Sequence, residues 1–403
     1  MCHDTLNNMR TVKLIHPGWL SAPNGANTVI NSILGSNDFF KAHGLDISSL
    51  SFDTYSPRSF SQESMKTWRS TLRASLKRWL KSASRYSRLA AVLIMYITQL
   101  KPSKKYALDY IESNPNPDEI VFFHSLLPCY YYLKYRKQKQ NTAVVLHTNG
   151  DNLKMERIYY PAIVKSSLYK KLEEMEAFVL DNADRINFVS KFSRDNFLQL
   201  HPNVDESKVF YIYNGIPDND ILTHKRSRAD VIEMCCVASV SRRKGQHYII
   251  DALKRFDESN RPAVHFTFVG EGSDRGGLES EVEKSGLRKF IDFVGVTQDV
   301  DGYLSKSNAY ILVSEDEGLP MAIIEAMRSS LPIISTPVGG IPEMIDNGVN
   351  GVMINPTTDD VYELLSTIDQ YDFEKMGANA YATFKSKFSL SQMLNGYVNL
   401  LSF

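Results

Sequence analysis

The chain has 403 residues, 43% of them hydrophobic and 23% charged, which is the composition of an ordinary soluble globular protein with room for two domains. Lys plus Arg and Asp plus Glu both total 46, so the overall charge points to no class of partner. The four cysteines, at positions 2, 129, 235 and 236, have neither metal-ligand spacing nor the pattern of a secreted disulfide framework, and they predict a reducing cytoplasm.

Two further segments bear on location. Residues 1–10 are polar and lack the apolar core of a signal peptide. The longest apolar run, 89–100, is too short and too mixed to span a bilayer. We therefore expect a cytoplasmic protein that is not integral to a membrane.

Apolar runs typical of strands alternate along the chain with segments of helical pattern. Several runs are nearly continuous, as expected of strands that helices cover on both faces. The predicted strands are 12–16, 119–124, 143–148 and 185–190 in the first half, then 231–240, 263–270, 290–295, 309–313 and 332–336 in the second. This alternation predicts an α/β protein with two doubly wound, Rossmann-like domains.

The expected domain boundary follows from the turn residues clustered at 213–220 and the polar, basic stretch that continues to Arg228. We expect an N-terminal domain at 1–213, a linker at 214–228 and a C-terminal domain at 229–387. The last segment, 388–403, has a helical pattern and is a candidate to cross back to the N-terminal domain.

Three N-terminal residues follow predicted strands and are candidates for a ligand site. Gly25 lies in a loop where glycine lets the backbone approach a ligand, although Asn24 and Asn27 there could equally serve as helix caps. His147 ends the strand at 143–148, where a parallel sheet places its cleft residues. The alternative is a histidine satisfied by loop backbone. His124 also ends a strand and is the weaker candidate.

Between residues 64 and 108 there are eleven Lys or Arg and no acidic residue. The apolar residues at helical spacing are Trp68, Leu72, Leu76, Trp79 and Leu80. A basic amphipathic helix with tryptophans on its apolar side suits an anionic membrane surface. The alternative is a helix packed on the sheet with a solvated basic face. Nucleic acid is not expected, because no known binding motif accompanies the charge.

Two carboxylates near the C-terminus carry most of the functional signal. Glu317 and Glu325 are separated by seven residues, across a Gly-Leu-Pro turn that follows the strand at 309–313. Strand, acidic loop and helix place a ligand at the carboxyl end of a parallel sheet. Pro320 suits the first position of the helix, whose N-terminal amides favour anions. Lys244 would supply positive charge to a leaving group. Taken singly, each of these residues could be structural.

The region 209–385 resembles the retaining glycosyltransferases of family 4, the group 1 type, which have the GT-B fold. The motifs that carry the resemblance, in order, are Asn214-Gly215-Ile216, Lys244-Gly245 with 249–252, 268–272, 293–295, the E-x7-E pattern from Glu317 to Glu325, and 339–343. The resemblance implies a hexosyltransferase-type enzyme that moves a sugar, with retention, from a nucleotide-sugar to a glycan or lipid-linked saccharide in polysaccharide biosynthesis. A UDP-sugar is the favoured donor and a GDP-sugar the alternative.

The resemblance also assigns roles to residues. The implied catalytic residues are Glu317, His147 and Lys244, with Glu317 and His147 on the transferred sugar and Lys244 at the diphosphate. The implied donor-binding residues are Glu325, on the ribose hydroxyls, and Gly318, Leu319, Gly25, Arg243, Val296 and Gly270. The family usually has an arginine five residues before the motif lysine. Ser239 stands there in this chain, and Arg242 or Arg243 could replace that arginine.

The remaining expectations concern cofactors, location and alternatives. No Asp-x-Asp ends a strand, so no essential metal or other cofactor is expected. The resemblance places the enzyme in the cytoplasm, peripheral on the inner face of the cytoplasmic membrane. The segment 270–276 nearly spells a dinucleotide fingerprint, but its third glycine is one residue late, which favours a turn over an NAD site. The alternatives are a sugar-nucleotide epimerase on the same fold and a catalytically silent scaffold or binding subunit, for which Ser239 is the hint.

Overall fold

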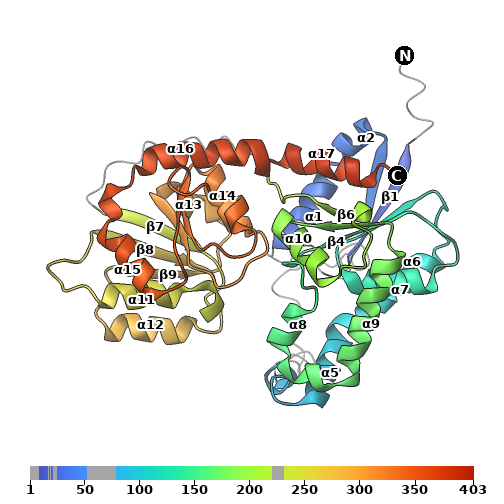
Figure 1. The fold of residues 1–403 in the computed structure, drawn as a ribbon, viewed down its shortest axis with the longest axis horizontal. Helices are drawn as coiled ribbons and strands as arrows, with labels where there is room; N and C mark the ends of the chain where they lie inside the picture. Colours follow the sequence, from blue (N-terminus) through green and yellow to red (C-terminus); the bar gives the residue numbers. More distant parts are fainter. Residues whose placement is uncertain (1–8, 17, 19, 21–24, 52–78, 220–230) are drawn as a thin grey trace, which may run out of the picture. The chain divides into compact units, whose positions relative to one another are not determined.

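The computed structural model describes residues 9–16, 18, 20, 25–51, 79–219 and 231–403, which form two compact units. Within these ranges the N-terminal unit holds residues up to 189 together with 193–212 and 394–403, and the C-terminal unit holds 190–192 and 213–393. Each unit is built on a six-stranded sheet whose strands are all parallel to their neighbours (Figure 1). This confirms the predicted α/β fold class.

The N-terminal sheet has the strand order β2-β1-β3-β4-β5-β6. Its strands are β1 (Arg10–Ile15), β2 (Leu45–Leu50), β3 (Ile120–Phe123), β4 (Thr142–Leu146), β5 (Arg185–Phe188) and β6 (Val209–Tyr211). Every residue of β3 and β4 is buried, because helices cover both faces of the sheet. The order reverses between β1 and β3, and a parallel sheet forms a crevice for ligands at such a point.

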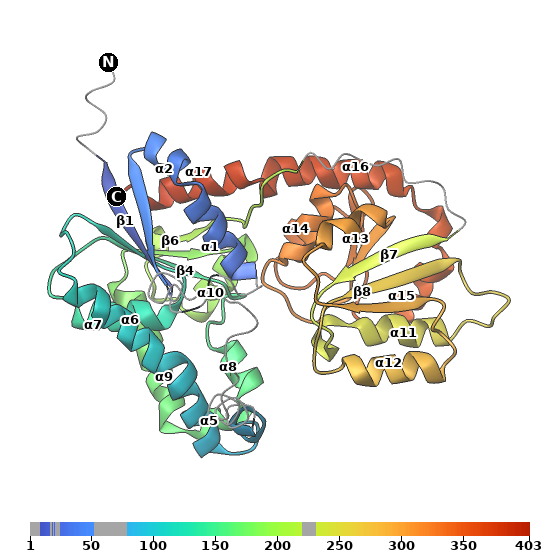
Figure 2. The same ribbon diagram turned by 180° about the vertical axis from the view of Figure 1, so that it is seen from behind.

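Helices flank this sheet on both sides, with α1 and α2 on one side and α6, α7 and α9 on the other (Figures 1 and 2). The helices are α1 (Gly25–Gly35), α2 (Asn37–Ala42), α5 (Arg88–Met95), α6 (Lys101–Glu112), α7 (Leu126–Tyr135), α8 (Lys154–Tyr159), α9 (Ser167–Asn182) and α10 (Lys191–Leu200). A π-helical turn, η1 (Tyr96–Leu100), joins α5 to α6, and a 3-10 turn, η2 (Pro161–Lys165), follows α8. The outer parts of α5 and α8 lie together away from the sheet in both views.

The C-terminal sheet has the order β12-β11-β10-β7-β8-β9. Its strands are β7 (Ile232–Val237), β8 (Val264–Val269), β9 (Ile291–Gly295), β10 (Ala309–Leu312), β11 (Ile333–Ser335) and β12 (Gly351–Met353). Its helices are α11 (Gln246–Lys254), α12 (Arg275–Lys284), α13 (Val300–Lys306), α14 (Met321–Arg328), α15 (Thr358–Ser366) and α16 (Phe373–Thr383). The order reverses between β7 and β10, so the loops after these two strands flank the crevice of this unit.

All nine predicted strands are present, and three more were not predicted. The unpredicted strands β2, β6 and β12 all lie at sheet edges. In β2, Leu-Asp-Ile-Ser-Ser-Leu, half of the residues are polar, and β6 and β12 have only three residues each. An edge strand buries less surface, so its sequence carries a weaker apolar signal. Pro320 does not begin α14 as predicted, because the helix starts at Met321 and Pro320 stands just before it.

The C-terminal helix α17 (Leu390–Leu401) carries the chain from one unit into the other, since its residues from 394 onward belong to the N-terminal unit. There the ring of Tyr397 packs against Phe122 with centroids 5.7 Å apart. The Arg185 guanidinium donates to the backbone oxygens of Asn399, Leu400 and Ser402 at 2.9, 2.7 and 2.8 Å. The last residues of the chain are therefore part of the N-terminal unit.

The segment expected to be a linker begins as packed structure. Asn214 and Ile216 are buried, and Ile216 forms a β-bridge with Ser389 in the C-terminal unit. Residues 220–228 of the expected linker lie outside the described residues, and so do 64–78 of the expected basic helix. Of that helix, 79–83 is described and is helical.

Candidate active site

Two loops at the reversal point of the C-terminal sheet bring the predicted donor residues together. The loop after β7 contains a 3-10 turn, Arg242–Lys244, and leads into α11. The loop after β10 contains Glu317 and leads into α14. Because β7 and β10 are neighbours in the sheet, residues 73 positions apart along the chain meet at its carboxyl edge.

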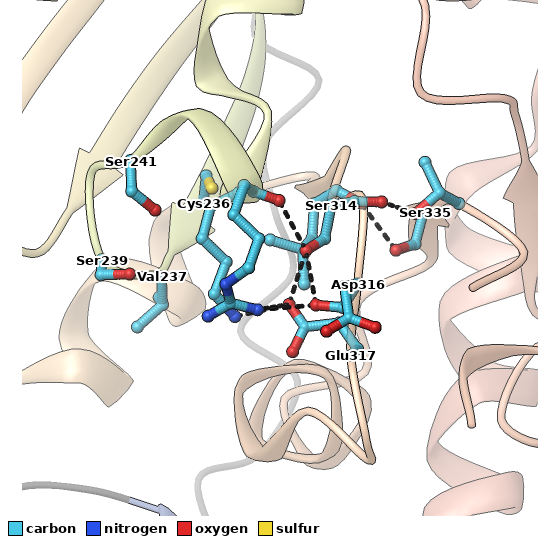
Figure 3. A network of polar contacts seen from close by, with 12 residues as sticks. Cys236, Val237, Ser239, Ser241, Ser314, Asp316, Glu317 and Ser335 are labelled. Carbon is cyan, nitrogen blue, oxygen red and sulfur yellow. Dashed lines mark hydrogen bonds and ion pairs between the residues drawn. The ribbon is translucent and has the colours of Figure 1, made fainter. Parts of the chain in front are cut away.

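Lys244 and Glu317 form the centre of this site. The Lys244 Nζ lies 2.5 Å from the Glu317 Oε1, and the two side chains are only 14% and 8% exposed. The Ser314 hydroxyl lies 2.7 Å from the same carboxylate oxygen and 3.0 Å from the Arg243 carbonyl oxygen (Figure 3). Removed from water, this carboxylate depends on its lysine and its hydroxyl partner. Ser314 was not predicted, although its place just after a buried strand could have suggested it.

Arg243 adds a second positive charge. Its guanidinium donates to the Asp316 carbonyl oxygen at 2.6 Å and lies 3.9 Å from the Glu317 Oε1. The Arg242 backbone N–H instead donates to Asp274 at 2.6 Å, and the Arg242 residue is exposed. Ser239 lies apart from this network (Figure 3). Of the two candidates to replace the missing arginine, the structure places Arg243 at the lysine and glutamate.

Two glycines allow these loops to approach each other. A Cβ on Gly245 would lie 1.8 Å from the Val313 carbonyl oxygen, and one on Gly339 would lie 1.7 Å from the Glu317 carbonyl oxygen. Their φ angles, +75° and +59°, also lie in the left-handed region that favours glycine. Both glycines belong to the motifs on which the family resemblance rests. The close approach of the two loops explains why these motif positions are glycine.

Glu325 lies on α14, and burial is the main factor that raises its pKa to about 7. The Arg328 charge lowers this pKa and the Asp301 charge raises it, and these two side chains pair with each other at 2.5 Å. Burial also holds the pKa of the Tyr310 hydroxyl well above its usual value, with smaller contributions from Glu317 and Glu325.

The other predicted donor-binding residues of this unit follow β8, β9 and β10 at the carboxyl edge of the sheet. Gly270 donates its N–H to the Gly295 carbonyl oxygen at 2.8 Å, which ties the ends of β8 and β9 together. Val296 follows directly and is 68% exposed, so its side chain is accessible. Gly318 accepts a hydrogen bond from the Gly340 N–H at 2.8 Å, while Leu319 is buried.

The remaining predicted residues, Gly25 and His147, belong to the N-terminal unit. Gly25 is the first residue of α1. His147 follows β4, and its Nε2 lies 3.1 Å from the Nδ1 of His124, which follows β3. Burial lowers the pKa of His147 to about 4 and that of His124 well below its usual value, and neighbouring histidines lower them further. Both rings are therefore neutral at physiological pH. His124, the weaker of the two histidine candidates for a ligand site, thus lies beside His147, the stronger one.

The described residues hold neither a metal-binding cluster nor a membrane-spanning helix. No group of three or more His, Cys, Asp or Glu among them could hold a metal ion. Within the same ranges, no helix has both the length and the apolar character needed to cross a bilayer. That the reaction needs no metal stays a prediction.

Two family models match the chain. The one described as glycosyl transferases group 1 covers residues 220–371, and the one described as glycosyltransferase family 4 covers 95–220. Together they take in both strand-end sites, with His124 and His147 in one and Lys244, Glu317 and Glu325 in the other. The chain belongs to the group 1 glycosyltransferases of family 4.

Known proteins resemble the chain in part. The Vi polysaccharide biosynthesis protein VipC/TviE of Salmonella typhi is 41% identical over 106 residues, which is 26% of this chain and 18% of that protein. An uncharacterized glycosyltransferase of Methanocaldococcus jannaschii is 28% identical over 223 residues, 54% of this chain and 59% of that protein. The matched regions thus span less than two thirds of either relative. The crystal structure of Anabaena Alr3699/HepE with UDP superimposes with a TM-score of 0.62 at 16% identity, covering 98% of this chain and 100% of that one. This likeness shows the shared GT-B fold.

Proposed function

We propose that this protein transfers a sugar from a nucleoside diphosphate sugar to a saccharide acceptor, with retention of the anomeric configuration. The observation that carries the proposal is the buried contact of Lys244 with Glu317 at the reversal point of the C-terminal sheet. A lysine and a carboxylate at this place suit the two halves of such a donor, the charged diphosphate and the hydroxyl-bearing sugar.

Donor binding would divide this ion pair between two parts of one ligand. The diphosphate would take Lys244 and Arg243, which leaves the Glu317 carboxylate to accept a hydrogen bond from a sugar hydroxyl. Positive groups fixed near the leaving phosphate stabilise the charge that develops as the glycosidic bond breaks. The positive end of the α14 dipole, at Met321, would add to this stabilisation.

Retention follows from attack on the face that the diphosphate leaves. The bond between the anomeric carbon and the phosphate oxygen breaks, the acceptor oxygen forms the new bond, and the leaving phosphate takes the acceptor's proton. The chain carries no motif for the widely separated acid and base of an inverting enzyme. Proton NMR of the product would test this step, and an inverted anomeric configuration would refute it.

Glu325 is suited to the ribose. Vicinal hydroxyls donate well to a carboxylate, and binding would favour the ionised form of a group whose pKa burial has raised. A uracil base is the favoured choice because the structurally similar Anabaena protein was solved with UDP. Val296 would then lie against the base.

A membrane surface is the proposed location, on the cytoplasmic side. Leu89 and Leu93 on α5 and Tyr96 at the start of η1 form an outward stripe at helical spacing, with Leu89 83% exposed. Tyr86, 87% exposed, and the exposed Arg88 lie beside it in the chain. Exposed aromatic and aliphatic side chains interleaved with cations favour an anionic lipid surface. Liposome flotation that did not depend on anionic lipid would refute this location.

A setting in polysaccharide biosynthesis is supported by the Vi polysaccharide relative. The acceptor would accordingly be a growing glycan or a lipid-linked saccharide. Its site would lie on the N-terminal unit, where His147 could contact the transferred sugar or the acceptor hydroxyl.

The test is a panel of UDP-, GDP-, ADP- and dTDP-sugars, with thermal shift and slow donor hydrolysis as readouts. We expect one donor to stabilise the protein and release its nucleotide, and both effects to vanish in Lys244→Ala and Glu317→Gln. Lys254→Ala is the matched control, because Lys254, on α11, also pairs with carboxylates, those of Asp251 and Glu281, but lies outside the site. A donor that ends as an isomeric nucleotide-sugar would indicate an epimerase. Absence of any response would favour a silent scaffold.

A further inference from the structure

The N-terminal unit contains a pocket that the proposed donor site does not use. It encloses about 320 Å³ at the carboxyl ends of β3 and β4. That volume is at the lower end of the range for small-molecule sites. Most of its wall is apolar, formed by Met95, Pro102, Leu126, Leu127, Leu146, Leu153 and Leu172. The π-helical turn η1 contributes Thr98 and Gln99, and such turns are frequent at functional sites.

Polar groups in this wall lack protein partners. The Ser125 hydroxyl, the Glu156 Oε2 and the His124 Nε2 are buried and have no hydrogen-bond partner among the described residues. Buried polar atoms without a partner are few in native proteins, so three in one pocket call for an explanation. A carboxyl group turns easily about its last bond, and serine changes rotamer readily, so both can face a ligand.

The histidine pair supplies a third polar group. His124 and His147 both line the pocket, and both are neutral because burial lowers their pKa values. One of the two nitrogens in their 3.1 Å contact must carry the proton. Whichever it is, the outer nitrogens of the pair then present one donor and one acceptor. A hydroxyl, which is itself both donor and acceptor, matches either arrangement.

The charge of the wall narrows the ligand further. Among the described residues that line the pocket there is no Lys or Arg, and burial raises the pKa of the Glu156 carboxyl. An anionic ligand would find no counter-charge there, whereas sugar hydroxyls can pair with the carboxyl, the hydroxyl and an imidazole. The C–H face of a sugar ring can pack on the leucines.

We propose that this pocket binds one uncharged sugar residue of the acceptor, held by Ser125, His147 and Glu156, with His124 as a positioning residue for His147. The assignment of this sugar to the acceptor rests on the proposed function. The sugar site itself stands on the pocket alone.

The test is saturation-transfer NMR on the full chain with the methyl glycosides of glucose, galactose, mannose, N-acetylglucosamine and N-acetylgalactosamine, and with glucuronate. We expect at least one neutral glycoside to bind and glucuronate not to. Glu156→Leu should weaken that binding about tenfold, as the loss of one good hydrogen bond would. It should also raise the melting temperature, because it removes an unpaired buried polar atom. Glu173→Gln, an exposed change on α9, is the control.

Three results would overturn the proposal: no neutral glycoside binds, glucuronate binds better, or Glu156→Leu binds the glycoside as the wild type does. A lower melting temperature in Glu156→Leu would show that the carboxyl is structural, and would also overturn it. The outcome is separable from that of the proposed function. Loss of glycoside binding in Glu156→Leu with no response to any nucleotide-sugar would keep the sugar site and refute the donor assignment. Normal donor binding with no glycoside binding would keep the donor assignment and refute the sugar site.

Discussion

Nucleotide binding should depend on pH through Glu325. Burial raises the pKa of its carboxyl to about 7, and a carboxyl that accepts ribose hydroxyls must be ionised. At pH 6 only about one molecule in ten would hold the ionised form, while at pH 8 about nine in ten would, so the apparent Kd should be roughly tenfold larger at pH 6. Binding should also release protons near pH 7, because the bound state favours the carboxylate.

The assay is titration calorimetry with the uridine nucleoside, which lacks phosphate groups that titrate in this range. Measurements in two buffers of different ionisation enthalpy count the released protons. Glu325→Gln is the matched variant, and it should bind weakly with no pH dependence between 6 and 8. A wild-type affinity that stays flat over this range, or a dependence that persists in Glu325→Gln, would refute the assignment of the ribose to Glu325.

The same pKa shift makes a statement about stability. Between the usual value of 4.5 and about 7, the folded protein holds a proton at Glu325 that the unfolded chain has lost, so the free energy of unfolding falls as the pH rises through this window. Glu325→Gln has no titrating carboxyl at this position, so its free energy of unfolding does not fall for this reason. Relative to the wild type it should gain up to about 3 kcal/mol between pH 4.5 and pH 8. Denaturation at the two pH values would measure the gain, and an equal difference at both would contradict the pKa.

Three further predictions concern stability. Lys244→Met leaves the Glu317 carboxylate buried without its lysine and should cost about 3 kcal/mol in urea denaturation, much of it recovered when Glu317→Gln is added. A double variant no more stable than the single one would contradict the pairing. Gly339→Ala should cost about 3 kcal/mol or more, because its Cβ would strike the Glu317 carbonyl oxygen. Gly348→Ala, at a positive φ but in open space, should cost about 1 to 2 kcal/mol, and equal costs would refute the clash. Tyr397→Phe removes a buried hydroxyl that has no partner among the described residues and should stabilise by about 1 kcal/mol. Tyr310→Phe loses a hydrogen bond to Val237 and should destabilise by a similar amount, so melting temperatures that shift in the same direction would contradict one of the two predictions.

The strands of the two sheet interiors and the edge strand β9 were predictable, and the other three edge strands were not. Interior strands such as β3 and β10 are entirely buried, so their residues must be apolar and the runs are visible in the chain. The strands β2, β6 and β12 are short or partly polar, and their pairing depends on the neighbour that supplies hydrogen bonds. A local pattern carries no information about that neighbour.

The donor-site residues divide in the same way. Lys244, Glu317 and Glu325 were predicted because each stands in a motif beside a strand end or a helix start. The choice between Arg242 and Arg243 could not be made from the chain, because adjacent residues in a 3-10 turn point in different directions. Only the folded loop shows that Arg243 reaches Asp316.

The sequence by itself determined the α/β class, the two-fold repetition of a doubly wound domain, and the identity of the acidic and basic residues at the strand ends. These follow from periodicity and local turns, which act over a few residues. The tertiary structure decided which strand ends are neighbours. It joined Lys244 to Glu317 across 73 positions, and it assembled a pocket from residues between Met95 and Leu172. Strand order in a parallel sheet is set by how whole helices and strands pack, and that packing is a property of the complete fold.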